Sequence, residues 1–229
     1  MITDIFGDQF QPPATMVLVT AGLALAIVFW NASWRPARNV VTIVHEAGHA
    51  VVALLAGRRL SSIRLHSDTS GVTVSRGRTE GPGMVCTALA GYLAPSVLGL
   101  VFAALLLGDR VGTVLIVCAA LLLGVLVMIR NLYGVLSLVI TGGVLFAVSW
   151  LATAEVKAAF AYLITWFLLV GGVRPVFELQ RKRRRGQARD SDADQLHRLT
   201  GAPGLFWVAV FAAINTGALA IASAWLLLP

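Results

Sequence analysis

Residues 40–56 read VVTIVHEAGHAVVALLA, an apolar run that is interrupted by His45, Glu46 and His49. In a helix, residues four positions apart lie on one face, so the two histidines can bind one metal ion. Polar side chains cost free energy in a segment that is apolar enough for a bilayer, and they generally mark a functional site. This stretch therefore predicts a helix with a zinc site inside a membrane domain.

The composition of the whole chain indicates a membrane protein. Of the 229 residues, 58% are hydrophobic and 13% are charged, and the mean hydropathy is +0.82. A soluble domain needs more polar surface than this. Seven apolar stretches approach the roughly 20 residues that cross a bilayer: 14–30, 40–56, 85–107, 111–129, 132–151, 158–173 and 205–228. We expect an all-α polytopic membrane protein of about seven transmembrane helices, forming a single domain over residues 1–229.

Two polar inserts interrupt the apolar stretches. Within residues 57–83, SIRLH (62–66) and GVTVS (71–75) alternate in polarity around a turn, which predicts a β-hairpin. Residues 180–203 begin with the basic run RKRRR (181–185) and continue as a short amphipathic helix that ends at Gly201. Residues 31–38 are expected to form a tight link between the first two spans.

The net charge of +7 is concentrated in the loops, which indicates membrane topology rather than nucleic-acid binding. If the basic run is cytoplasmic, the 57–83 hairpin is cytoplasmic as well. Four basic residues then lie on the opposite side: Arg35, Arg38, Arg110 and Lys157. We expect a multi-pass protein of a bacterial plasma membrane with a cytoplasmic N-terminus, no nucleic-acid partner, and contacts between the basic run and anionic lipid headgroups.

The HEAGH pentapeptide also suggests a reaction. A zinc ion held by His45 and His49 acts as a Lewis acid and lowers the pKa of bound water toward ~7. Glu46 lies beside the metal, where it can take a proton from the water and pass it to a leaving amine. Ala47 and Gly48 are small and leave space there. The alternative is that both histidines pair with neighbouring polar groups without a metal.

The order of the motifs resembles the site-2 protease family of intramembrane zinc metalloproteases. HEAGHA (45–50) is followed by the hairpin and then by ALAGYLAP (88–95), and in that family a hairpin and a small-residue helix follow the HExxH helix. The resemblance covers residues 40–143. It implies zinc as the cofactor, a site near the cytoplasmic face, and hydrolysis of peptide bonds in or near transmembrane segments of membrane proteins. The hairpin at 60–83 could offer an edge strand to a locally unwound substrate.

The second motif of that family, NxxPxxxLDG, is incomplete in this chain. Asn131 stands at the Asn position, but Gly134 replaces the proline and Val139 replaces the metal-binding aspartate. The resemblance implies that Asn131 holds the substrate backbone, and a plain helix-end residue is the alternative. The missing aspartate supports a second function, a catalytically inactive membrane scaffold. The intact Glu46 argues against that scaffold, because a structural zinc site has no use for a general base.

The third zinc ligand must therefore come from another part of the chain. The acidic residues that remain near the cytoplasmic face are Glu178, Asp190, Asp192 and Asp194. The SDA sequence at 191–193 resembles an element of the divergent site-2-protease-like branch, which implies Asp192 as the ligand. Asp194 and Glu178 are the alternatives. Asp192 and Asp194 can also be read as acidic residues that favour the N-terminal end of a helix.

Overall fold

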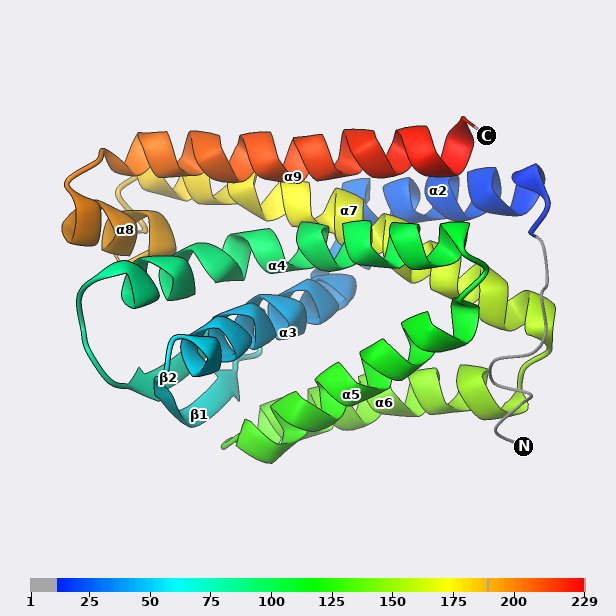
Figure 1. Cartoon of the computed structure of the whole chain (residues 1–229), viewed down its shortest axis with the longest axis horizontal. Helices are drawn as coiled ribbons and strands as arrows, with labels where there is room; N and C mark the ends of the chain where they lie inside the picture. The colour runs from blue at the N-terminus through cyan, green and yellow to red at the C-terminus, as the bar shows by residue number, and fades with distance from the viewer. Residues whose placement is uncertain (1–11, 189, 229) are drawn as a thin grey trace.

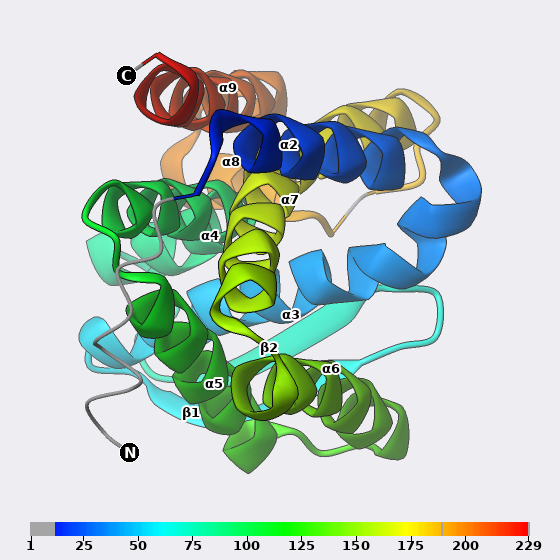
Figure 2. The same cartoon turned by 90° about the vertical axis from the view of Figure 1, so that its right-hand side faces the viewer.

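The computed structural model of the chain describes residues 12–188 and 190–228, which form eight helices and one two-stranded sheet. In chain order the elements are α2 (Ala14–Phe29), α3 (Asn31–Leu55), β1 (Arg59–Leu65), β2 (Gly71–Arg76), α4 (Pro82–Leu107), α5 (Val111–Met128), α6 (Leu132–Leu151), α7 (Ala154–Arg184), α8 (Asp192–Thr200) and α9 (Gly204–Leu227). Helices α4 and α9 run along the long axis of the molecule, α3 crosses the bundle obliquely, and the hairpin and α8 lie together at one end (Figure 1). Seen along that axis, α7 lies near the centre with the other long helices around it (Figure 2).

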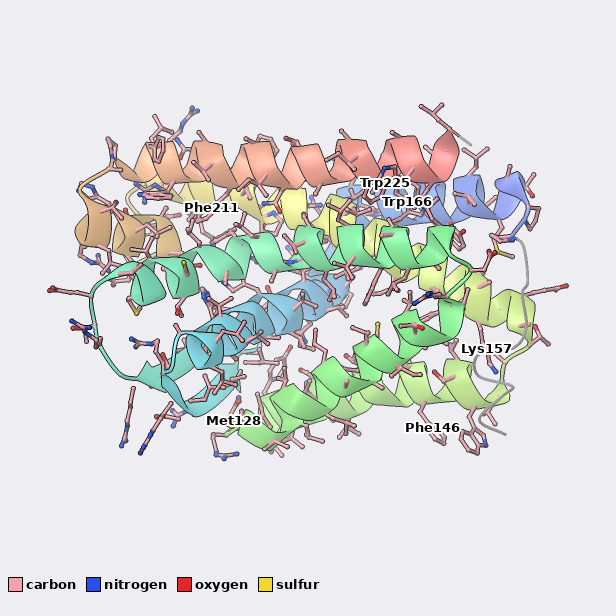
Figure 3. All side chains as sticks on the ribbon, viewed as in Figure 1. Met128, Phe146, Lys157, Trp166, Phe211 and Trp225 are labelled. Atoms are coloured by element: carbon pink, nitrogen blue, oxygen red, sulfur yellow. The ribbon has the colours of Figure 1, made fainter. Side chains whose placement is uncertain are left out.

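Five helices are long and apolar enough to cross a membrane, namely α4, α5, α6, α7 and α9. Helices α2 and α3 pass the same test only as a pair, which is bent by 101°. The described residues thus provide five candidate spans, or six with the bent pair, where the sequence predicted seven. Apolar side chains on the outer helices face away from the bundle, as Phe146 does at 62% exposure, and this is consistent with a lipid-facing surface (Figure 3).

The bend between α2 and α3 was not predicted, and the predicted link at residues 31–38 is wrong. Helix α3 begins at Asn31 and continues through Pro36, which removes only one hydrogen bond near the start of the helix. The chain bends at Trp30, which has an extended backbone with φ −85° and ψ 120°. Arg174 of α7 donates to the carbonyl of Val28 and, at 2.6 Å, to Asn31 Oδ1. Helix α7 therefore holds both sides of the bend.

This bend changes the predicted sidedness of the first two helices. The beginning of α2 lies at the end of the molecule opposite the hairpin and α8 (Figure 1). The predicted cytoplasmic position of the N-terminus stays a prediction. The placement of Arg35 and Arg38 opposite the basic run is wrong, because both line one pocket with Arg181 and Lys182. The physical reason is that α2 and α3 form one bent path instead of two spans.

The predicted hairpin is confirmed. Strands β1 and β2 pair antiparallel from Arg59 opposite Arg76 to Leu65 opposite Gly71. The segment between α5 and α6 joins the other edge of β1, where the backbone N–H of Arg130 donates to the carbonyl of Ile63 at 2.9 Å. Strand β1 is thus flanked on both sides, whereas β2 has a free outer edge among the described residues.

The structure confirms the short helix in the second insert but shortens the loop before it. Helix α7 continues to Arg184, so most of the basic run forms its last turn. Helix α8 begins after Ser191, which caps its N-terminus, and ends at Gly201, which has the left-handed φ of +77°. Ala193 and Leu196 are fully buried in a cluster with side chains of α4, α7 and α9. This packing fixes which face of α8 points toward α3 and α4.

Candidate metal centre

His45 and His49 of α3 and Asp192 of α8 bring three donor atoms to one point. The two histidine Nε2 atoms are 3.1 Å apart, and Asp192 Oδ2 is 3.3 Å from each of them. In a tetrahedral zinc site with bonds of 2.0–2.1 Å, neighbouring ligand atoms lie about 3.3 Å apart. The three atoms therefore match three corners of such a site. The side chains are 12–22% exposed, so the site is only partly buried.

The state of Asp192 also fits a metal ligand. Its Oδ2 atom is buried and has no hydrogen-bond partner among the described residues. Burial disfavours the charged carboxylate, but the adjacent His49 and His45 hold the pKa of Asp192 well below its ordinary value. An ionised carboxylate oxygen beside two imidazole nitrogens is a donor set that zinc accepts. The residues present therefore fit a zinc ion.

The other two candidates for the third ligand are engaged elsewhere. Asp194 accepts hydrogen bonds from Arg183 and from Ser191 Oγ, the latter at 2.6 Å. Glu178 accepts from Trp34 Nε1 at 2.9 Å and from Arg174 Nε at 3.0 Å. Of the three acids considered from the sequence, the structure brings Asp192 alone to the histidines.

Helix α4 orients the histidines. His49 Nδ1 lies 2.7 Å from the carbonyl of Thr87, and a proton donated there leaves Nε2 free to bind a metal. A Cβ atom on Gly91 would lie 2.6 Å from His45 Nε2, so the close approach of α4 requires glycine. The ring of Tyr92 packs edge-on against His45, with ring centroids 4.9 Å apart. The Ala-Gly-Tyr segment, used above only for its resemblance, thus forms the wall behind the ligands.

Strand β2 holds the carboxylate of Glu46, which is only 3% exposed. Thr73 Oγ1 donates to Glu46 Oε2 at 2.6 Å. A Cβ atom on Gly71 would lie 2.5 Å from Glu46 Oε1, so β2 approaches the carboxylate most closely at this glycine. The sequence analysis did not identify Thr73 or Gly71. Their place on alternate positions of the strand was the available signal, because residues 71 and 73 share one face.

Asn131 lies at the start of α6 and contacts the hairpin. Its Nδ2 donates to the carbonyl of Leu65 at 2.6 Å, and its Oδ1 accepts from the N–H of Leu65 at 3.2 Å. The amide therefore pairs with both backbone groups of the last residue of β1, as a neighbouring strand would. The contact with substrate backbone that the resemblance implied for Asn131 stays a prediction.

The comparison with known families agrees with the motif order. The family model described as Peptidase M50B-like matches residues 18–222, which include α3, the hairpin and α8. This is a site-2 protease family, so the resemblance inferred from the sequence is confirmed. No curated protein and no solved structure matches the chain.

Proposed function

The chain belongs to the Peptidase M50B-like family, and we propose that it is an intramembrane zinc metalloprotease. Its reaction is the hydrolysis of a peptide bond in or near a transmembrane segment of another membrane protein. The observation that carries the proposal is the convergence of His45, His49 and Asp192 at distances suited to zinc, with the buried Glu46 next to them on α3. These groups lie at the hairpin end of an apolar helix bundle.

The residues of the site suit each step of peptide hydrolysis. When bound, zinc supplies Lewis acidity that polarises the scissile carbonyl. Glu46, held by Thr73, takes one proton from the attacking water as the oxygen bonds to the carbonyl carbon. Glu46 then gives this proton to the amide nitrogen as the C–N bond breaks. The products are a carboxylic acid and an amine, and Glu46 regains its charge.

The free edge of β2 is the surface we propose for the substrate backbone. Val72 and Val74 are exposed, whereas Gly71 and Thr73 face Glu46. An extended segment that pairs with this edge would run past the general base, with backbone hydrogen bonds providing affinity. Such binding requires the substrate helix to unwind locally near the hairpin.

We place the hairpin, α8 and the end of α7 on the cytoplasmic side of a bacterial plasma membrane. Arg35 and Arg38 line one pocket with residues of the basic run, which adds to the excess of basic residues on the proposed cytoplasmic side, as the positive-inside rule predicts. Lys157 lies at the opposite end of the molecule (Figure 3). Helix α2 then begins on the outer side. In intact cells, an impermeant thiol reagent should label a cysteine introduced at Thr15 but not one at Ser67, and the reverse pattern would overturn this assignment.

The direct test of the proposed activity uses the purified chain in proteoliposomes with a panel of single-span peptides that contain helix-destabilising residues. We expect mass spectrometry to show cuts within or near the span. The cuts should disappear in Glu46→Gln and after zinc chelation. Cleavage that survives both treatments would contradict the proposal. A folded, zinc-loaded chain that cuts none of the peptides would favour the inactive scaffold.

A further inference from the structure

A polar pocket that is separate from the metal centre takes no part in the proposed reaction. It is open, measures about 760 Å³, and lies between the first turns of α3, the hairpin turn and the end of α7. None of the three metal ligands lines it. Its charged lining consists of six basic and two acidic residues: Arg35, Arg38, Arg174, Arg181, Lys182, Arg185, Asp68 and Glu178.

The base of this pocket is a closed polar network. Glu178 accepts hydrogen bonds from Trp34 and Arg174, and its other oxygen lies 3.5 Å from Arg38 Nη2. The guanidinium of Arg174 lies over the ring of Trp34, with 4.9 Å between Cζ and the ring centroid. The charge of Glu178 is therefore compensated at the base, and this carboxylate does not neutralise the basic residues at the rim.

The rim of the pocket has an excess of positive charge. Arg35, Arg181 and Arg185 are exposed, and no described carboxylate forms an ion pair with them. The acid at the rim is Asp68, whose pKa is lowered by hydrogen bonds from Ser70, so it is ionised at neutral pH. A concave surface with several unpaired guanidinium groups concentrates positive potential and attracts anions.

The chemistry of the rim matches a phosphate group. Guanidinium groups bind phosphate oxygens through paired hydrogen bonds, and basic pockets beside membrane helices accept phosphorylated headgroups. The hairpin turn and the last turn of α7 both line the pocket, and both lie at one end of the apolar bundle (Figure 1). In the proposed orientation this end is at the depth of lipid headgroups. We propose that this pocket binds the phosphate group of an anionic ligand, either a phospholipid headgroup or a soluble phosphate.

A ligand at this position would connect α7 to the hairpin. Arg38 Nη1 donates to Thr69 Oγ1 at 3.0 Å, and Thr42 Oγ1 donates to the carbonyl of Thr69 at 2.8 Å. Thr69 lies in the turn that leads into β2, the strand that holds Glu46. A phosphate bound between the basic end of α7 and this turn would therefore restrain the turn of the hairpin.

The test measures binding to the full chain, purified and delipidated in detergent, by the fluorescence of its tryptophans. The probes are phosphatidylglycerol in mixed micelles, neutral phosphatidylcholine, and inorganic phosphate. The pocket variant Arg181→Gln/Arg185→Gln is compared with Arg76→Gln/Arg184→Gln, which removes the same charge from exposed positions outside the pocket. Both variants are first checked for unchanged helix content and monodispersity.

We expect the pocket variant to bind phosphatidylglycerol about 10- to 30-fold more weakly. Each basic residue near a membrane surface contributes about 1 kcal/mol to such binding, which is about fivefold in affinity, and the variant removes two of them. The matched variant should keep the affinity of the unmodified chain. Equal losses in both variants would overturn the proposal, since only net charge would then matter. The proposal would also be overturned if the unmodified chain bound neither phosphatidylglycerol nor inorganic phosphate. Competition by inorganic phosphate identifies a soluble ligand, and its failure to compete identifies the lipid headgroup.

Discussion

Two carboxylates at the hairpin end of the molecule have opposite surroundings. Glu178 of α7 meets Trp34, Arg174 and Arg38, which satisfy and neutralise it. Asp192 of α8 is buried, has no hydrogen-bond partner among the described residues, and lies 3.3 Å from two imidazole nitrogens. Because guanidinium groups already compensate Glu178, this carboxylate stabilises the contact between α3 and α7. Asp192 lies next to two imidazole nitrogens and is therefore suited to bind a metal ion.

Both carboxylates are positioned by the same helix, α3. Trp34 and Arg38 face Glu178, and His45 and His49 face Asp192, about two turns further along. The bend at Trp30 brings the first turns of α3 against α7, which is why the first cluster exists at all. One helix therefore supports a structural cluster and a proposed catalytic one.

The largest expected effect separates the two acids by activity. Asp192→Ala should reduce peptide cleavage on the order of 10³-fold, because the several kcal/mol of transition-state stabilisation from the metal are lost. Glu178→Gln should change cleavage by far less when compared at equal amounts of folded protein. The measurement is the cleavage rate of one transmembrane peptide in proteoliposomes. Similar losses of cleavage rate in Asp192→Ala and Glu178→Gln would contradict the different roles of these two acids.

The next effect concerns the hold of β2 on the general base. Thr73→Val removes the hydrogen bond to Glu46 and should lower the cleavage rate about 10-fold, since a hydrogen bond to a charged group contributes about 1.5–3 kcal/mol. The zinc content should not change. Thr73→Ser, which keeps the hydroxyl, should restore most of the rate. A valine variant with the unmodified rate would show that Thr73 does not position Glu46.

Glu178→Gln should reveal its structural role through stability. The amide cannot neutralise Arg174 and Arg38, and the partly buried cations lose a charged partner. We expect the free energy of unfolding to fall by about 1–3 kcal/mol, measured by denaturation in mixed detergent micelles. Asp192→Ala in the zinc-free chain is the contrasting variant, because it removes a buried carboxylate whose neighbours are two imidazole rings instead of guanidinium groups. If Asp192→Ala lowered the free energy of unfolding more than Glu178→Gln does, the structural role would belong to Asp192 and not to Glu178.

The smallest effect is the pH dependence of a third acid, Asp194. Partial burial would raise its pKa, but hydrogen bonds from Ser191 and Arg183 hold the pKa of Asp194 below its ordinary value. A lowered folded-state pKa stabilises the protein fully above the unfolded-state pKa, and the contribution is lost as the pH falls through the folded-state value. Asp194→Asn should therefore lower the melting temperature at neutral pH, and the difference should shrink in acid. A difference in melting temperature that stays constant from neutral to acid pH would contradict the proposed contribution of ionised Asp194 to stability.

The sequence was sufficient for the elements whose signals are local. The spacing of His45 and His49 and the alternation in residues 62–66 and 71–75 predicted the metal helix and the hairpin, because both depend on neighbouring residues. Gly201 likewise marked the end of α8. Asp192 was reached only through a resemblance, since nothing local distinguishes it from Asp194.

The remaining features depend on contacts between distant segments. The bend at Trp30 is held by Arg174, more than 140 positions away, so hydropathy alone gave two separate spans and placed Arg35 and Arg38 on the wrong side. The contact of Thr73 with Glu46 joins a strand to a helix 27 positions earlier. Hydropathy and periodicity carry no information about such pairings.

The most direct test of the central claim is the zinc content of the purified chain by elemental analysis, beside four variants. We expect close to one zinc per chain in the unmodified protein, in Glu46→Gln and in Glu178→Gln, and almost none in His45→Ala and Asp192→Ala. Zinc that persists in Asp192→Ala but disappears in Glu178→Gln would contradict the ligand assignment. An unmodified chain that contains no zinc, purified under conditions that retain metals, would contradict the metalloprotease itself.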